Sequence, residues 1–198
     1  MDLGPVIVTR KNGEEPFTNG SGPAIQLIDF WKWSVSDLLS NATRGKLAEF
    51  IVANALQICS SVRVEWDNYD MVDHDKIRIE VKSSAYLQSW HQNNLSAISF
   101  DIAEKRSYCY ETNKLGDSVC RNNDFYIFCL LHHKDKSTVD PMDLAQWTFY
   151  ILPTSVLNEK LGTQRRLSLK RLKSLHPVIC SYQTLRTELD RLKSDVFS

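Results

Sequence analysis

Several features that assign proteins to a class are missing from this sequence. It has no net charge, because 24 basic residues balance 24 acidic ones, so the chain as a whole carries no surplus of cations for a polyanion. Its longest apolar run, FYIFCLL at 125–131, is far too short to span a bilayer. Its five cysteines are an odd number without a CxxC pair, which argues against a zinc knuckle or a disulfide framework. We therefore expect a cytoplasmic protein with no membrane partner.

What remains is an ordinary globular composition, with 42% hydrophobic and 24% charged residues. The 198 residues suffice for one well-buried α/β domain and are marginal for two. Zero net charge does not exclude nucleic acid as a ligand, because a local basic patch binds phosphate whatever the sum over the chain.

The first part of the chain differs from the rest. Residues 1–23 hold four of the seven glycines and three of the six prolines, which predicts a flexible arm with one short strand at 5–9. From residue 24 on, apolar residues at three- and four-residue spacing predict a helix over 25–40. A break at SNATRG follows, where Asn41 or Thr43 can cap a second helix over 45–58, with Leu47, Phe50 and Ile51 on its apolar side.

The strands lie downstream of these helices. Alternating residues predict a hairpin from 61–72 and 77–82, and continuous apolar segments predict buried strands at 125–131 and 147–152. Residues 98–111 fit either a strand or the start of a helix, and the tail from Thr154 reads as two helices broken near His176. This order predicts a single α/β domain over 24–198, with a mixed central β-sheet flanked by helices.

The stretch KIRIEVKSSAYLQSW, residues 76–90, which begins as a strand, carries the candidate chemistry. Glu80 and Lys82 point to one face because side chains in a strand repeat every two residues. A hairpin through VDHDKI folds Asp70 back beside that face, and Glu49 lies on the preceding helix. Carboxylates beside an ammonium are what Mg²⁺-dependent phosphodiester cleavage requires, because hard oxygen ligands hold the ion and leave water positions free.

The segments RGKLAEF, WDNYDM and RIEVKSSAYLQSW together resemble the PD-(D/E)XK nuclease superfamily. The resemblance covers roughly residues 34–157 and implies a restriction-endonuclease-like core. It implies that Asp70, Glu80 and the main-chain carbonyl of Val81 hold Mg²⁺, for which Mn²⁺ can substitute. It also implies that Lys82 is the catalytic lysine, and that Glu49 completes the site through metal-bound water or a second ion.

The sequence departs from the literal motif at Tyr69, because no proline precedes the aspartate. Asp67, Asp73 and Asp75 lie close by and are alternatives. We prefer Asp70 because it ends the apolar-flanked strand, whereas Asp73 and Asp75 belong to an exposed turn.

Further residues are candidates for binding nucleic acid. Gln88 matches a polar position in the segment after the ExK element and could contact the lysine or the DNA backbone. The segment TQRRLSLKRLK, residues 163–173, contains five basic residues and no acidic one, which predicts either a surface that contacts phosphates or a solvated helix face. These basic residues are Arg165, Arg166, Lys170, Arg171 and Lys173.

The sequence therefore predicts a Mg²⁺-dependent DNA endonuclease of restriction or defence type, working as a homodimer or within a larger complex. One alternative is a catalytically inactive nucleic-acid-binding or assembly module on the same fold. The other is a protein-interaction domain in which Glu80 and Lys82 form only a surface ion pair.

Overall fold

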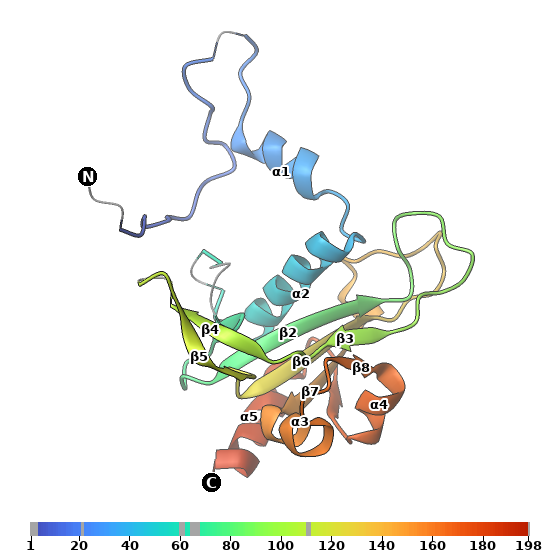
Figure 1. Ribbon diagram of the computed structural model, residues 1–198. Helices are drawn as coiled ribbons and strands as arrows, with labels where there is room; N and C mark the ends of the chain where they lie inside the picture. Colours follow the sequence, from blue (N-terminus) through green and yellow to red (C-terminus); the bar gives the residue numbers. More distant parts are fainter. Residues whose placement is uncertain (1–3, 21, 60–61, 64–67, 110–111, 198) are drawn as a thin grey trace.

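A five-stranded mixed sheet forms the centre of the computed structural model, which describes residues 4–20, 22–59, 62–63, 68–109 and 112–197 (Figure 1). The strand order is β1-β2-β6-β7-β9, in which β2 and β6 run parallel and the other neighbours antiparallel. This confirms the predicted α/β class with a mixed central sheet. The strands are β1 (Met71–Val72), β2 (Arg78–Ala85), β6 (Phe125–Leu131), β7 (Trp147–Pro153) and β9 (Val178–Cys180).

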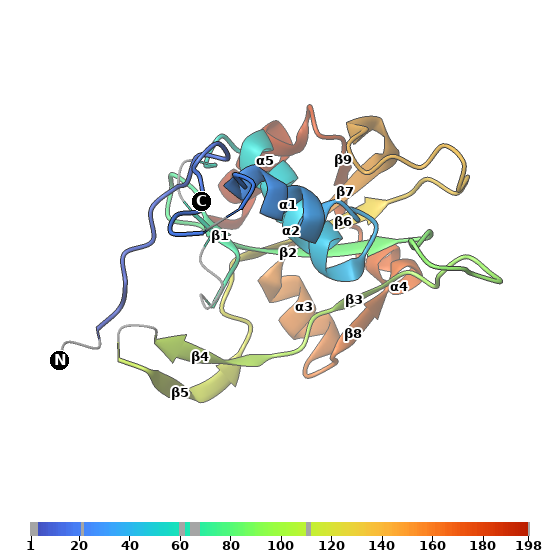
Figure 2. The ribbon, with the colours of Figure 1, turned by 90° about the horizontal axis from the view of Figure 1, so that it is seen from above.

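Two hydrophobic cores lie on opposite faces of this sheet. On one face pack α2 (Asn41–Ala55) and α5 (Leu185–Phe197). On the other pack α3 (Thr154–Leu161), α4 (Leu169–Ser174) and the small sheet of β3 (Ser99–Asp101) and β8 (Arg166–Ser168), as Figure 2 shows from above. Two cores on a single sheet make this a layered α/β arrangement.

Strand β6 is buried along its whole length, as its continuous apolar sequence predicts. Ile127 and Cys129 face the core under α2 and α5, whereas Tyr126 and Phe128 face the core under α3 and α4. Each large apolar side chain buried in this way contributes about 1.5–3 kcal/mol relative to an exposed one. The strand therefore fixes β2, which pairs with it over seven positions and carries Glu80 and Lys82.

Helix α2 begins earlier than the sequence predicts. The hydroxyl of Ser40 accepts a hydrogen bond from the backbone N–H of Thr43, so Ser40 caps the helix rather than Asn41 or Thr43. The expected break at SNATRG is the cap and first turn of this helix. Its buried apolar side chains are Ala48, Ile51 and Val52, and the prediction that Phe50 lies on this side was wrong, because the helix turns Phe50 away from the sheet and leaves it 54% exposed.

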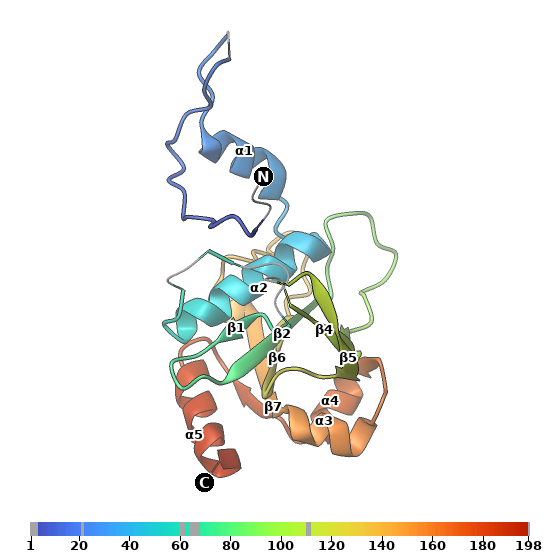
Figure 3. The same cartoon turned by 60° about the vertical axis from the view of Figure 1, so that its left-hand side comes forward.

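The N-terminal segment lies apart from both cores (Figures 1 and 3). Helix α1 (Leu27–Val35) is shorter than predicted and has no buried residue. Backbone hydrogen bonds connect residues 13–17 to 25–28, and Pro16 pairs with Gln26. The strand expected at 5–9 does not form. The division of the chain at residue 23 and the flexibility of the arm stay predictions.

Several elements were wrong or missing in the sequence prediction. The first hairpin strand is seen only at Met71–Val72, while residues 62–63 are not in a strand and 64–67, which include Asp67, lie outside the described residues. Of the two alternatives for residues 98–111, the strand is the one observed at β3 (Ser99–Asp101), and β4 (Lys105–Cys109) pairs with β5 (Lys114–Cys120) in a hairpin that the sequence did not reveal.

The C-terminal region also contains more than two helices. Strands β8 and β9 interrupt it, each three residues long, and pair with β3 and β7. The break near His176 is confirmed, because α4 ends at Ser174 and His176 has φ of 53°. A short 3₁₀ turn (Leu144–Gln146) precedes β7. None of the helices described is long and apolar enough to cross a membrane.

Candidate active site

The pairing of β1 with β2 places Asp70 against the backbone of β2. The N–H of Asp70 donates to the carbonyl of Ile79 at 3.1 Å, and Asp70 Oδ2 accepts a hydrogen bond from the N–H of Val81 at 2.7 Å. The N–H and C=O of one residue point to the same side of a β-strand, so the Val81 carbonyl also faces the side on which Asp70 lies. Asp70 and the Val81 carbonyl are therefore on the same edge of β2.

Glu80 is a buried carboxylate that two lysines share. The residue is 4% exposed, and its Oε1 accepts hydrogen bonds from Lys82 and from Lys105, the latter at 3.1 Å. Lys82 comes from the same strand, whereas Lys105 is the first residue of β4. Burial alone lowers the pKa of Lys105, but the charge and hydrogen bond of Glu80 outweigh it and raise that pKa above its usual value. The ion pair of Glu80 and Lys82 therefore does not lie on a solvated strand face.

The carboxylate of Asp70 is buried near two other carboxylates, where a negative charge is unfavourable. Burial, followed by the charges of Glu80 and Glu49, raises its pKa from 3.8 to about 6, with Lys82 and the hydrogen bond from Val81 opposing the rise. Burial and the charges of Glu80, Asp101 and Asp70 also raise the pKa of Tyr126, which lies beside Glu80 on β6. The site therefore has an excess of negative charge that its lysines do not fully balance around Asp70.

Glu49 lies on α2 near this cluster, as the helix position predicts. Its carboxylate forms an ion pair with Arg63, in which Nη2 donates to Oε1 at 3.0 Å. Its charge contributes to the raised pKa of Asp70. Among the described residues, however, no three Asp, Glu, His or Cys side chains are grouped as ligands of a common metal ion. The candidate site here is limited to Asp70, Glu80 and the Val81 carbonyl, with Glu49 as a charged neighbour.

Gln88 is buried and bound within the protein. Its amide oxygen accepts from Arg44 at 3.3 Å, and its Nε2 donates to the carbonyl of Ala85 and the hydroxyl of Ser96. Arg44 itself donates to Ser83 at 3.0 Å, one residue after Lys82. Gln88 thus helps to connect α2 with β2, and its contact with a nucleic acid stays a prediction.

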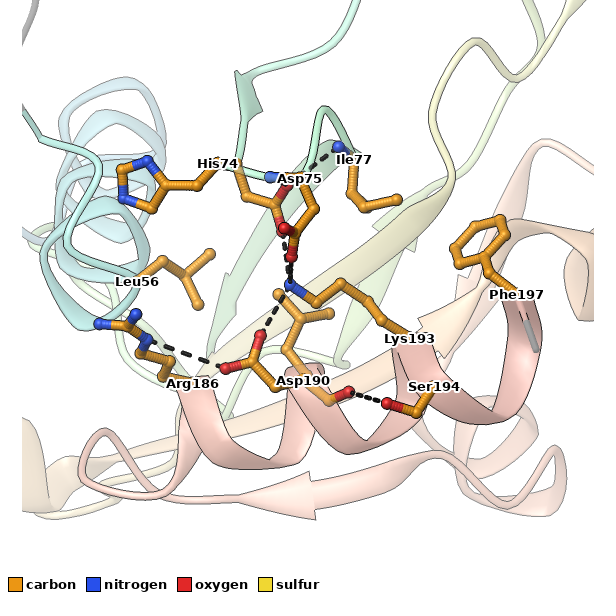
Figure 4. A pocket seen from close by; sticks show the side chains of 11 residues that line it. Leu56, His74, Asp75, Ile77, Arg186, Asp190, Lys193, Ser194 and Phe197 are labelled. Atoms are coloured by element: carbon orange, nitrogen blue, oxygen red, sulfur yellow. Dashed lines mark hydrogen bonds and ion pairs between the residues drawn. The ribbon is translucent and has the colours of Figure 1, made fainter.

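The turn after Asp70 is not simply exposed. Asp73 is buried, at 8% exposure, and accepts a hydrogen bond from Lys193 of α5 at 2.8 Å. Figure 4 shows Lys193 beside Asp75 and Asp190, which it also contacts, at the edge of a cavity of about 740 Å³. Asp73 is therefore engaged in holding the hairpin turn to α5, and the expectation of an exposed turn was wrong for this residue.

The predicted basic segment is exposed, but its secondary structure differs from the prediction. Arg166 lies on β8 and Lys170, Arg171 and Lys173 on α4, so the segment is a strand followed by a helix rather than one helix. All of them, and Arg165, are exposed, while Leu167 and Leu172 are buried beneath them. The five basic side chains are thus exposed on a segment that Leu167 and Leu172 pack against the core.

Two residues of the site were not found from the sequence. Lys105 contacts Glu80 from β4, and the side chain of Asn68, two residues before Asp70, binds the backbone of Tyr108 at 2.7 and 3.3 Å. Lys105 lies in the segment for which the sequence favoured neither strand nor helix. Lys105 could have been placed at the site only if the β4–β5 hairpin after β3 had been predicted from the sequence.

The donor atoms fit a hard divalent cation. Asp70 and Glu80 offer carboxylate oxygens, the Val81 carbonyl faces the same side as Asp70, and a cation would relieve the repulsion that raises the pKa of Asp70. Lys82 and Lys105 supply positive charge beside these oxygens. Such a combination of oxygen donors and ammonium groups suits an anionic substrate such as a phosphodiester.

Comparison with known proteins gives an independent result. No curated protein sequence matches this chain. A family model, bacteriophage T4 endonuclease IV, matches residues 28–171, which is more than half of the chain and includes Glu49, Asp70, Glu80, Lys82 and Lys105. The chain therefore belongs to the bacteriophage T4 endonuclease IV family, a family of nucleases.

Proposed function

We propose that this protein is a Mg²⁺-dependent endonuclease of the PD-(D/E)XK type that hydrolyses phosphodiester bonds in DNA, in a restriction or defence role. One observation carries the proposal. The buried Glu80 forms an ion pair with Lys82. The carboxylate of Asp70 accepts a hydrogen bond from the backbone of Val81, the residue between Glu80 and Lys82. Membership of an endonuclease family supports the nuclease activity.

The metal would be held by Asp70, Glu80 and the Val81 carbonyl, with Mn²⁺ as a substitute for Mg²⁺. When bound, it supplies a water of lowered pKa and positive charge next to the scissile phosphate. Glu49 would bind a metal-bound water, and its contribution to the raised pKa of Asp70 supports this role.

Lys82 would stand next to the attacking water. Its side chain is 20% exposed and its ammonium group is held by Glu80, so it is oriented before substrate binds. In the reaction the water oxygen forms a bond to phosphorus and releases a proton to solvent, the bond from phosphorus to the leaving oxygen breaks, and the leaving oxygen takes up a proton from solvent. Lys82 orients the water and stabilises the charge that develops on the phosphoryl oxygens.

The exposed cations on β8 and α4 would contact the nucleic-acid backbone. Phosphate contacts fix the position of a nucleic acid without reading its sequence. They suit DNA cleavage whether the protein acts as a homodimer, which would cut both strands, or within a larger complex.

The proposal is tested by incubating purified protein with circular DNA, linear DNA and RNA, each with Mg²⁺, Mn²⁺ or EDTA. We expect nicking or linearisation of circular DNA with either metal and none with EDTA. Glu80→Gln should abolish cleavage, whereas Glu159→Gln, the same change at an exposed position of α3, should leave it intact. Binding of DNA without cleavage under every condition would instead indicate an inactive nucleic-acid-binding module.

A further inference from the structure

Lys105 is a second cation on the Glu80 carboxylate, and the proposed function assigns it no role. Its Nζ lies 3.1 Å from Glu80 Oε1, the same oxygen that accepts from Lys82. One carboxylate is neutralised by one ammonium group, so Glu80 would remain paired with Lys82 if Lys105 moved away. Lys105 could therefore bind a substrate anion while Glu80 keeps its ion pair with Lys82.

The two lysines differ in their access to solvent. The side chain of Lys105 is 56% exposed, compared with 20% for Lys82 and 6% for Glu80. An exposed lysine on a flexible four-carbon stem can leave its partner and stay hydrated while it does so. Lys105 is thus the more accessible of the two cations for a phosphate that approaches from solvent.

The backbone around Lys105 is fixed to the site at a second point. Asn68 both accepts from the N–H and donates to the C=O of Tyr108, which lies on the same strand as Lys105. Strand β4 is therefore attached near both Asp70 and Glu80, although the β4–β5 hairpin lies outside the five-stranded sheet (Figures 1 and 2). This attachment holds Lys105 at the site through its backbone as well as through its side chain.

We propose that Lys105 is a second catalytic lysine, whose ammonium group passes from Glu80 to a non-bridging oxygen of the scissile phosphate. This inference rests on the proposed function. In this role Lys105 transfers no proton. It donates hydrogen bonds to the phosphoryl oxygens while their negative charge grows, and the β4–β5 hairpin is the element that presents it to the substrate.

The first test compares Lys105→Met and Lys105→Arg with Lys114→Met, which makes the same change at an exposed position on β5 of the same hairpin. Cleavage is measured under single-turnover conditions with saturating enzyme and Mg²⁺. We expect Lys105→Met to slow cleavage by about 100-fold or more, Lys105→Arg to restore part of the rate, and Lys114→Met to match wild type. Melting curves confirm that each variant is folded.

The second test is independent of metal and of turnover. In EDTA, Glu80→Gln removes the carboxylate that holds the lysines, so the variant should bind a labelled oligonucleotide more tightly than wild type, measured by fluorescence anisotropy over a range of salt concentrations. Adding Lys105→Met to Glu80→Gln should reduce this gain and lower the salt slope by about one phosphate contact. Adding Lys114→Met should leave the gain unchanged.

Two results would overturn the inference while leaving the proposed function intact. One is cleavage by Lys105→Met within about threefold of an active wild type. The other is an equal loss in Lys114→Met and Lys105→Met, which would indicate a general effect of charge. A wild-type protein that cleaves no nucleic acid with any metal would refute the proposed function, and the catalytic role of Lys105 with it.

Discussion

The raised pKa of Asp70 leads to a prediction about the metal-free protein. Replacing Asp70 by Asn removes a negative charge from a buried place near Glu80 and Glu49, while an amide oxygen can still accept the hydrogen bond from Val81. We therefore expect Asp70→Asn to be more stable than wild type above pH 6 when no divalent ion is present.

The magnitude follows from the pKa in the two states. The pKa of Asp70 is 3.8 in its ordinary state and about 6 in the folded protein, so folding takes up a proton between these values. Stability then falls as the pH rises through this window, and the full cost, about 3 kcal/mol, is present above about pH 7. An amide accepts a weaker hydrogen bond than a carboxylate, a loss of about 1 kcal/mol. We expect a net gain of about 1–2 kcal/mol at pH 8 and almost none at pH 4.

The assay is thermal unfolding of both proteins between pH 4 and pH 8 after removal of metals. For a chain of this length the expected rise in Tm at pH 8 is about 2–8 °C. Saturating Mg²⁺ should reverse the order, because ligand at 100 times its Kd stabilises wild type by about 2.7 kcal/mol and the variant lacks a ligand atom. Asp73→Asn is the matched control, and it should be less stable than wild type because Asp73 binds Lys193.

The reasoning would be refuted by an Asp70→Asn variant that is less stable than wild type by the same margin at pH 4 and pH 8. Such a result would mean that the carboxylate is not under electrostatic stress in the folded protein. It would also remove the main physical reason for placing a divalent cation beside Asp70.

Other substitutions give further predictions. Lys193→Met should destabilise the protein by about 1–3 kcal/mol in urea unfolding, because it leaves the buried Asp73 without its cation. Arg44→Ala should cost about 2–4 kcal/mol in the same assay, because Arg44 is buried and donates to Leu39, Asn41, Ser83 and Gln88. Arg166→Met, at an exposed position, should change stability by less than about 0.5 kcal/mol and reduce the salt slope of DNA binding by about 1.

The elements that the sequence predicted well have local and unambiguous patterns. Strand β6 is apolar throughout, and the alternation in β2 sets Glu80 and Lys82 apart from Ile79 and Val81. The hairpin turn between the two candidate strands was sufficient to bring Asp70 beside β2. Periodicity and one turn are properties of short segments, which is why the placement of Asp70 beside Glu80 and Lys82 could be predicted without a structure.

The elements that were missed depend on partners distant in the chain. Strands β8 and β9 have three residues each, too few for a periodic pattern, and exist because β3 and β7 pair with them. The β4–β5 hairpin is largely exposed and shows no apolar alternation, so its sequence resembles a loop. Asp73 is buried because Lys193, 120 residues later, docks on the turn. Lys105 was missed for the same reason, since it reaches Glu80 only through the fold.

The central claim is that Asp70 and Glu80 hold one divalent cation together. Calorimetric titration of the metal-free protein with Mn²⁺ tests it directly, on wild type, Asp70→Asn, Glu80→Gln and Asp73→Asn. The account predicts a site in wild type that is lost in Asp70→Asn and in Glu80→Gln and kept in Asp73→Asn, whose side chain is engaged with Lys193. Unchanged Mn²⁺ binding in both Asp70→Asn and Glu80→Gln would contradict it.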